Sequence, residues 1–367
     1  MNAARVKGFP VPESRFPSPA LVPASRSLVS IIIVNWDGRC HLETCLDSLE
    51  AQTFRDFEVI VVDNGSTDGS VPFVRERYPW VHLVELPKNT GFATGNNIGL
   101  THAAGEYIVV LNNDTKADAE WLARLVGVAD AYPRAGMVGS RICSFEDPDV
   151  IDSLGHGVCR DGMSRGRFRL RRYSTLKMNE VEEIFFPSAC VALYRRAMLN
   201  DIGFFDDDFF AYAEDTDLGL RGRLAGWDAV LATKAVVYHK YSGTGGVFSP
   251  FKLYLVERNH YWAALKNFPL HVLLLVPLFT LARYWAQARA VFSASGSGQE
   301  FLVSGSRGEL LKAILHGTWD AFLGIPAALK KRAQVMKTRK ITGREMAQLL
   351  KRYRLSFREL LDDGVVR

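Results

Sequence analysis

Three acidic residues stand close together in the segment FFAYAEDTDLGLR, at positions 214, 215 and 217. The segment predicts the start of a helix whose apolar face is buried. Burial raises the pKa of a carboxylate and a helix N-terminus lowers it, so Glu214 or Asp215 is suited to act as a general base. Acidic residues in a first turn also simply stabilise the helix. The choice between catalysis and helix capping therefore depends on the other polar clusters.

Apolar, β-branched runs at residues 28–34, 57–62 and 106–111 predict buried strands. Helical patterns follow at about 39–52, 95–103 and 119–131. Repeated strand-helix alternation indicates an α/β fold with a doubly wound, mostly parallel sheet. Ligands of such sheets bind beyond the carboxyl ends of the strands, and polar clusters at Asn35, Asp63 and Asn112 lie at such ends.

The cluster after the second strand is Asp63-Asn64-Gly65-Ser66. Its composition is that of an ordinary turn. Its alternative role is to bind a nucleotide, with the Asp63 carboxylate accepting hydrogen bonds from a nucleobase or ribose while the backbone amides of Asn64 and Gly65 approach the ligand.

The segment NTGFATGNN, residues 89–97, combines glycine and asparagine at a helix start. Gly91 and Gly95 permit close backbone approach, and Asn89 and Asn96 supply amide groups, so the segment suits phosphate or a sugar. Phe92 belongs to the same expected binding loop.

Asn112-Asn113-Asp114 ends a buried strand with one carboxylate beside two amides, a set suited to Mg²⁺ or Mn²⁺ bound together with a diphosphate. His239 follows the apolar strand 235–238 and precedes a Ser/Gly-rich segment. A histidine in that place is either a satisfied core residue or a ligand, metal included.

Six segments occur in the order seen in glycosyltransferase family 2. They are VSIIIVNWDG (29–38), VVDNGSTDGS (61–70), NTGFATGNNIGL (89–100), VVLNNDT (109–115), FFAYAEDTDLGLRGRLAGW (209–227) and VVYHKYSGT (236–244). The chain most resembles the rhamnosyltransferase-like branch, from about Leu28 to Pro269. This resemblance implies the A-type glycosyltransferase fold, also called the nucleotide-diphospho-sugar transferase fold.

The resemblance also implies roles for single residues. The family's nucleotide-sugar contacts fall on Asn35 and Asp63, and its DxD motif falls on residues 112–114, including Asn113 and Asp114. Its second metal ligand falls on His239. The first acid of the DxD motif is Asn112 in this chain, so metal binding rests on Asp114 with help from His239.

The family's ED motif falls on Glu214 and Asp215, and the resemblance makes Asp215 the base, with Glu214 second. In an inverting transfer, an acceptor hydroxyl attacks the anomeric carbon opposite the nucleoside diphosphate. The base removes the hydroxyl proton, and a divalent metal stabilises the departing diphosphate. The resemblance favours a deoxythymidine-diphosphate rhamnose donor, then uridine-diphosphate sugars, and a lipid-linked or cell-surface glycan acceptor.

The composition, 48% hydrophobic and 23% charged, is that of a globular protein, and the five cysteines form no CxxC pair that would indicate zinc. We expect a disordered Pro-rich tail at 1–27, a catalytic domain at 28–268 and a helical, basic C-terminal region at 269–367. The net charge of +5 is modest, and eleven Lys or Arg residues lie between Lys330 and Arg358. We expect contact with an anionic membrane at the inner face of the cell membrane, in the cytoplasm, and no nucleic acid.

The most apolar stretch is LHVLLLVPLFTLA, residues 270–282. It is shorter than the roughly 20 residues that span a bilayer, so a core helix or an interfacial helix fits it better than a membrane span. Arg283 and Arg289 after it, with the basic run, suit a protein that rests on an anionic leaflet. A solvated helix face is the alternative for the basic run.

Four other classes fit less well. A dinucleotide-dependent oxidoreductase would carry GxGxxG after its first strand, where this chain has NWDGR. A processive polysaccharide synthase would carry several spans and a QxxRW motif. A nucleotidyltransferase would carry a basic, glycine-rich loop near the first strand. A non-catalytic nucleotide-sugar-binding protein stays open because of Asn112.

Overall fold

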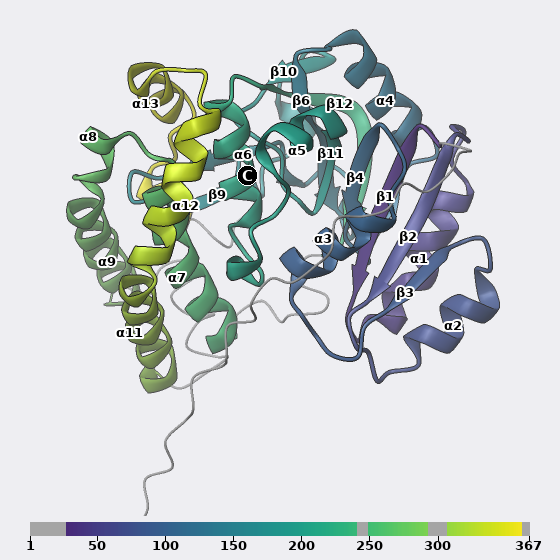
Figure 1. Ribbon diagram of the computed structural model, residues 1–367, viewed down its shortest axis with the longest axis horizontal. Coiled ribbons are helices and arrows are strands. Elements are labelled where there is room, and N and C mark those ends of the chain that lie inside the picture. Colours follow the sequence, from purple (N-terminus) through teal and green to yellow (C-terminus); the bar gives the residue numbers. More distant parts are fainter. Residues whose placement is uncertain (1–26, 241–248, 293–306, 362–367) are drawn as a thin grey trace, which may run out of the picture.

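The computed structural model describes residues 27–240, 249–292 and 307–361, and Figure 1 shows their arrangement. Within these ranges ten strands form one mixed sheet. They are β1 (Val29–Asn35), β2 (Phe57–Asp63), β3 (His82–Glu85), β4 (Tyr107–Leu111), β5 (Thr115–Ala117), β6 (Ala135–Ser144), β7 (Ile151–Ser153), β10 (Val181–Glu183), β11 (Val191–Arg195) and β12 (Asp228–His239). A separate hairpin consists of β8 (His156–Val158) and β9 (Ser164–Gly166).

The described helices divide between the sheet and the C-terminal region. Those up to the end of the predicted catalytic domain are α1 (Arg39–Glu50), α2 (Ser70–Arg77), α3 (Phe92–His102), α4 (Trp121–Ala131), α5 (Arg196–Ile202), α6 (Glu214–Leu224) and α7 (Pro250–Asn267). Those after it are α8 (Leu270–Leu273), α9 (Val276–Phe292), α11 (Arg307–Leu323), α12 (Ile325–Thr338), α13 (Gly343–Arg352) and α14 (Phe357–Leu361). Short 3₁₀ turns lie at η1 (Tyr173–Thr175) and η2 (Asp207–Phe209).

The sheet has the order β10-β12-β6-β11-β4-β1-β2-β3. β1, β2, β3 and β4 pair in parallel, and so do β6 and β12. β11 is antiparallel to both of its neighbours, β4 and β6. The expected mostly parallel sheet is therefore confirmed, with an antiparallel strand at its centre that brings the segment before it to the carboxyl end of β4.

Apolar side chains fill the space on both faces of the sheet. In β1, Ile32 packs into one core cluster, while Ile31 and Ile33 pack into a second cluster together with Leu46 of α1 and Trp121 of α4. This alternation is why the run LVSIIIV is apolar without interruption: a strand covered by helices on both faces buries every side chain. The strand's carboxyl end is thereby fixed in position.

The C-terminal region packs against the rest of the chain. Val335 of α12 and Met346, Leu350 and Tyr353 of the α13 segment belong to the same core cluster as Ile32. Figure 1 shows α8, α9, α11, α12 and α13 on the side of the molecule opposite β1, β2 and β3, with α7 between them and the sheet. The division at residues 268 and 269 stays a prediction, and the expected tail at 1–27 lies outside the described residues except for its last one.

Candidate active site

A cavity of about 860 Å³ lies at the carboxyl ends of β1, β2, β4 and β12. Its remaining wall comes from the hairpin β8–β9, the segment before α6 and the first half of α7. The predicted site residues that line it are Asn64, Asn89, Gly91, Phe92, Asn113, Asp114, Glu214, Asp215 and His239. Segments far apart in the sequence thus supply one site, as expected for polar clusters at strand ends.

Side-chain hydrogen bonds join the ends of three strands behind this wall. Asn113 donates from Nδ2 to Oδ1 of Asn35 at 2.7 Å, and Asn35 donates from Nδ2 to Oδ1 of Asp63 at 3.0 Å. The other oxygen of Asp63 accepts from the backbone N–H of Ser66 at 2.9 Å. Gly38 leaves room for the contact, because a Cβ there would lie 2.1 Å from Nδ2 of Asn113. The network fixes the loops that reach the cavity.

The segment that precedes the two carboxylates is strained. Phe210, Tyr212 and Ala213 have φ values of 62°, 67° and 64°, which L-residues rarely adopt. Asn259 of α7 holds the segment by donating from Nδ2 to the carbonyl oxygens of Phe209, Ala211 and Tyr212 at 2.7–2.9 Å. Strained backbone of this kind persists where its surroundings over-determine it, commonly at functional sites.

Glu214 and Asp215 begin α6 and point into different surroundings. Glu214 is buried, and burial together with the nearby charge of Asp215 raises its pKa to about 8. Asp215 accepts from the backbone N–H groups of Thr216 at 2.6 Å and Ala189 at 3.2 Å. Glu214 is thus mostly protonated at neutral pH, and a protonated carboxyl cannot act as a base.

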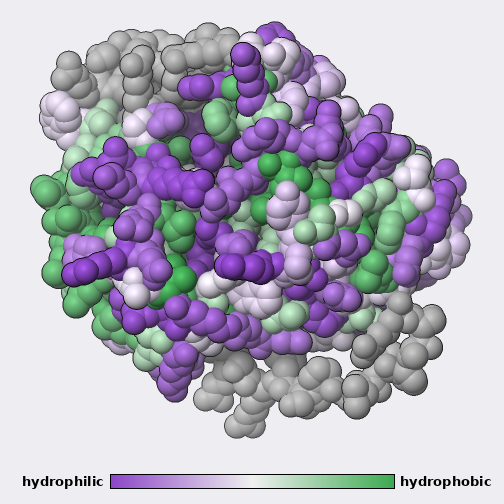
Figure 2. Space-filling view, turned by 90° about the horizontal axis from the view of Figure 1, so that it is seen from above, coloured by the Kyte–Doolittle hydropathy of each residue, from purple (hydrophilic) through white to green (hydrophobic). Residues whose placement is uncertain are grey.

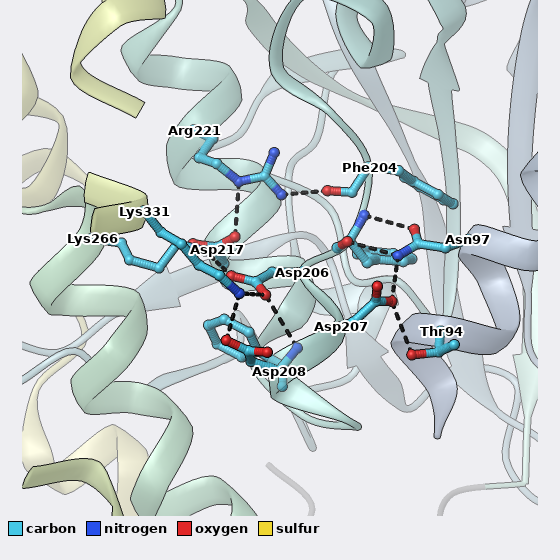
Figure 3. Close-up of polar contacts among 12 residues, drawn as sticks. Thr94, Asn97, Phe204, Asp206, Asp207, Asp208, Asp217, Arg221, Lys266 and Lys331 are labelled. Carbon is cyan, nitrogen blue, oxygen red and sulfur yellow. Dashed lines mark hydrogen bonds and ion pairs between the residues drawn. The ribbon is translucent and has the colours of Figure 1, made fainter. Parts of the chain in front are cut away.

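The third acid, Asp217, belongs to an ion-pair network on the same helix. Its carboxylate contacts Nε of Arg221 and Nζ of Lys266, both at 2.8 Å. Burial opposes its ionisation, but the two cations outweigh burial and hold the pKa of Asp217 well below its usual range. Figure 3 shows that Lys266 of α7 and Lys331 of α12 also contact Asp206, which lies just before η2. The network locks α6, α7 and α12 together, so Asp217 has a structural role.

His239 lies between two carboxylates at the end of β12. Its Nε2 is 3.3 Å from Oδ1 of Asp114, and its Nδ1 is 2.8 Å from Oδ2 of Asp152. Burial alone would lower the pKa of His239, but Cys190, Asp114 and Asp152 hold it well above the usual value. Asp152 also contacts Nη1 of Arg169 at 2.5 Å. A carboxylate behind a histidine fixes the ring and is the common arrangement around metal-binding histidines.

The donor set of Asp114 and His239 fits a divalent metal. Neighbouring ligands of an octahedral cation with bonds of ~2.1 Å lie about 3 Å apart. The 3.3 Å between Asp114 Oδ1 and His239 Nε2 is close to that value. Among the described residues, no three His, Cys, Asp or Glu side chains gather as a complete metal site. Such a site is typical of Mg²⁺ or Mn²⁺ held with a substrate diphosphate and water.

Comparison with known proteins places this chain in a family. The family model described as Glycosyl transferase family 2 matches residues 30–203. N-acetylglucosaminyl-diphospho-decaprenol L-rhamnosyltransferase of Mycobacterium tuberculosis is 32% identical over 243 residues, which cover 59% of this chain and 78% of that protein. The chain belongs to glycosyltransferase family 2. It is a glycosyltransferase, and its sheet with a C-terminal helical region is the expected A-type glycosyltransferase fold.

Further similarities run over parts of larger proteins or at low identity. The O-antigen biosynthesis protein RfbC of Myxococcus xanthus is 31% identical over 230 residues, 59% of this chain and 17% of that protein. A crystal structure of S. aureus TarS 1–349 has a TM-score of 0.49 and 19% sequence identity, and the match covers 88% of this chain and 91% of that one.

Four predicted donor-binding residues of this glycosyltransferase lie outside the cavity wall. Asn35 and Asp63 support the strand-end loops from behind, and Asn96 is fully buried and donates to the carbonyl of Phe92 within α3. Gly65 packs against the backbone of Lys88. We expect these residues to affect donor binding through the residues that they position.

Gly95 does not line the cavity. A Cβ at Gly95 would lie 2.9 Å from Val34 of β1, so this glycine lets α3 pack on the sheet. Gly91, with a φ of +90°, differs: it lines the cavity and packs against Phe210. Only the first of the two glycines thus faces the site.

Several cavity residues of the glycosyltransferase escaped sequence reasoning. They include His156, Arg165 and Arg169 from the hairpin segment, and Lys252 from α7. His156 Nδ1 lies 3.8 Å from Oδ2 of Asp215. The available signal was the cluster of glycine and basic residues in GHGVCRDGMSRGRFR, residues 155–169, which is too polar for a core segment. The hairpin segment thus puts a histidine beside Asp215 and adds two arginines to the cavity wall.

Proposed function

We propose that this glycosyltransferase moves a sugar, rhamnose by preference, from a nucleoside-diphosphate donor to a hydroxyl of a lipid-linked or cell-surface glycan by a single inverting displacement. One observation carries the proposal: Asp215 lies in the same cavity as the amide-rich loops at the strand ends. A base on one side and a nucleotide-binding wall on the other are what such a displacement needs. No covalent intermediate is required, so one unprotonated carboxylate suffices.

The donor occupies the wall formed by the strand-end loops in this proposal. Asn64 and Asn89 offer amide groups to the nucleoside and sugar, and Asn64 is itself held by contacts with Asn89 and Thr90. Asp63 and Asn35 keep these loops in place. The relative from Mycobacterium tuberculosis is named as an L-rhamnosyltransferase, which supports a rhamnosyl donor.

Asp215 is the proposed base and Glu214 supports it. The raised pKa of Glu214 leaves it neutral at pH 7, so it adds no second negative charge beside Asp215. Asp215 takes the proton from the acceptor hydroxyl as that oxygen attacks the anomeric carbon. The bond from the anomeric carbon to the diphosphate oxygen breaks in the same step, and the diphosphate leaves with the electron pair.

Asp114 and His239 are the proposed ligands of a Mg²⁺ or Mn²⁺ ion. When bound, such an ion would stabilise negative charge on the departing diphosphate. Asp152 holds the imidazole ring of His239 by the contact at Nδ1, and thereby directs Nε2 toward Asp114.

The acceptor approaches from the hairpin β8–β9. Arg165 and Arg169 of this segment line the cavity and suit an acceptor that carries phosphate. The same relative is named for an N-acetylglucosaminyl-diphospho-decaprenol acceptor, a lipid-linked sugar. We therefore place the enzyme in the cytoplasm at the inner face of the cell membrane, in peripheral contact with anionic lipid.

A thermal-shift screen of nucleotide sugars, each with and without Mn²⁺, tests this function. A ligand that binds only the folded state raises the apparent stability by RT ln(1 + [L]/Kd). We expect deoxythymidine-diphosphate rhamnose to give the largest shift, and Mn²⁺ to increase it. A screen in which no nucleotide sugar shifts the melting temperature would contradict the proposal.

A further inference from the structure

We propose that the outward faces of α9 and α11 form a docking surface for an anionic lipid bilayer, with both helices lying in the plane of the membrane. The choice of a bilayer as the binding partner rests on the proposed function, because the bilayer would carry the lipid-linked acceptor. Its test measures vesicle binding and succeeds or fails independently of sugar transfer.

Apolar side chains form a stripe on α9 and the turn before it. Leu274, Leu278, Leu281 and Trp285 are 72%, 61%, 66% and 66% exposed. Within α9, the last three recur at intervals of three and four residues, the spacing of one helix face. Four large apolar side chains at this exposure are more than the scattered apolar residues of an ordinary surface.

A second stripe lies on α11. Leu311, Leu315, Trp319 and Phe322 are 58–63% exposed, again at helical spacing. A contact of 3.2 Å between Oη of Tyr284 on α9 and Oγ1 of Thr318 joins the two helices. Figure 2 shows a hydrophobic surface at its left edge, the side on which Figure 1 places α8, α9 and α11. The stripes therefore form one surface.

The opposite face of α9 carries a buried charge. Arg283 is fully buried and contacts Oδ2 of Asp161 at 2.5 Å and Oε1 of Glu257 at 2.7 Å. On a helix of 3.6 residues per turn, Arg283 lies about 160° from both Leu281 and Trp285. The expectation that Arg283 meets an anionic leaflet was therefore wrong: it fastens α9 to α7 and to the segment before β9.

This anchor decides between spanning the bilayer and lying on it. Leu270–Gln287 is apolar enough to cross a membrane by length and composition, and only 17% of that window is buried, so it is not buried as a core helix would be. A spanning helix would take Arg283 into the hydrocarbon and leave the buried carboxylates of Asp161 and Glu257 without their partner, which is strongly unfavourable. Lying flat keeps the buried ion pairs and covers the exposed stripe. The helix has the two faces of an interfacial helix.

The charge around the stripes favours a bilayer over a second copy of the chain. From Leu270 to Phe292 the sequence has no Asp or Glu, and from Ala321 to Arg344 it has seven Lys or Arg and no acid. Lys312 on α11 and Lys330 and Lys337 on α12 are exposed. Two like-charged copies would repel each other across such a surface, whereas anionic headgroups attract it.

Flotation of the full-length protein with lipid vesicles tests the proposal. The wild type should float with vesicles of phosphatidylcholine and phosphatidylglycerol, and less with phosphatidylcholine alone. L281Q/W285Q on α9 and L315Q/W319Q on α11 should each bind at least tenfold more weakly. The matched control is Trp80→Gln, which removes an indole that is 41% exposed and lies next to β3, and it should bind as the wild type does.

Each variant is first shown to be folded by a melting temperature close to that of the wild type, a measurement that needs no sugar transfer. Point variants are preferable to truncation, which would remove Val335 and Met346 from the core. Wild-type protein that fails to float, or double variants that float equally well, would overturn the proposal. A wild-type dimer in light scattering that the same variants convert to monomer would assign the surface to a subunit interface instead.

Discussion

Replacing Glu214 with Gln removes a buried carboxyl group without changing its shape. In the folded protein Glu214 is 6% exposed, and burial with the charge of Asp215 raises its pKa from 4.5 to about 8. Glutamine imitates the protonated acid, which is the form that the folded protein favours at neutral pH. We therefore expect Glu214→Gln to fold and to transfer sugar at pH 7 at a rate near that of the wild type.

The raised pKa predicts how the stability difference between the two proteins depends on pH. Between pH 4.5 and 8 the unfolded state ionises Glu214 while the folded state keeps its proton, so the free energy of unfolding of the wild type falls as pH rises. At about 1.4 kcal/mol per pH unit over an interval of about 3.5 units, the loss reaches about 5 kcal/mol. Glu214→Gln lacks this loss, so its advantage should be absent near pH 4.5 and largest at pH 8 and above.

Urea unfolding at several pH values measures the difference directly. The control is Glu76→Gln, which removes an exposed carboxylate from α2 and should leave the pH dependence unchanged. A variant that gains nothing over the wild type between pH 5 and 8 would show that Glu214 ionises freely in the folded state. If Glu214→Gln is also inactive while Asp215→Asn turns over normally, Glu214 is the base and our assignment is wrong.

Four further predictions concern the proposed chemistry. Asp215→Asn should lower the transfer rate about 10²–10⁴-fold with little change in donor affinity, and proton NMR of the wild-type product should show an inverted anomeric centre; retention would refute the single displacement. Asp63→Ala should weaken donor binding in calorimetry, because it removes the hydrogen bonds that hold Asn35 and the backbone of Ser66, each worth about 1–3 kcal/mol, and equal affinity would show that the strand-end loops keep their shape without it. Asp114→Ala and His239→Ala should each weaken Mn²⁺ binding, and the double variant should be no worse than about the poorer single one; full additivity would argue for separate roles. Asn259→Ala should lower the transfer rate at saturating donor and leave nucleotide affinity unchanged, because it releases the strained segment before α6; an unchanged rate would show that the segment holds its shape without it.

Local sequence patterns predicted three neighbouring parallel strands of the sheet. The β-branched runs marked β1, β2 and β4 to within a residue because strands covered on both faces need apolar side chains at every position. A second rule predicts that Asn35, Asp63 and Asn113 lie together, because the carboxyl ends of parallel strands meet at one edge of the sheet. The structure joins their side chains by hydrogen bonds. Here a one-dimensional pattern was sufficient because the geometry of a parallel sheet is nearly fixed.

The other half of the cavity depends on contacts that no local pattern encodes. β8 and β9 have three residues each and lack a periodic signal, so His156 and Arg165 could not be placed. Asn259 lies about 50 residues from its partners in sequence, and its role is visible only beside the carbonyl groups of residues 209–212. The local sequence predicted a surface position for Arg283, after an apolar stretch. Its burial could not be foreseen because its partners, Asp161 and Glu257, lie 122 and 26 residues away in sequence.

α7 connects the proposed chemistry to the proposed membrane surface. Leu255 and His260 face the cavity, while Tyr254 donates to Asp320 of α11 at 2.6 Å and Trp262 donates to the carbonyl of Ala321 at 3.1 Å. A helix is about 10 Å across, so two helices, α7 and α11, or about 20 Å, would separate the cavity from a bilayer on the outward faces of α9 and α11. The diphosphate and sugar of a lipid-linked acceptor would cross this gap to Asp215 while the lipid chain stays in the membrane. Extraction of the lipid would be unnecessary, and the Arg residues of the hairpin would meet the phosphates on the way in.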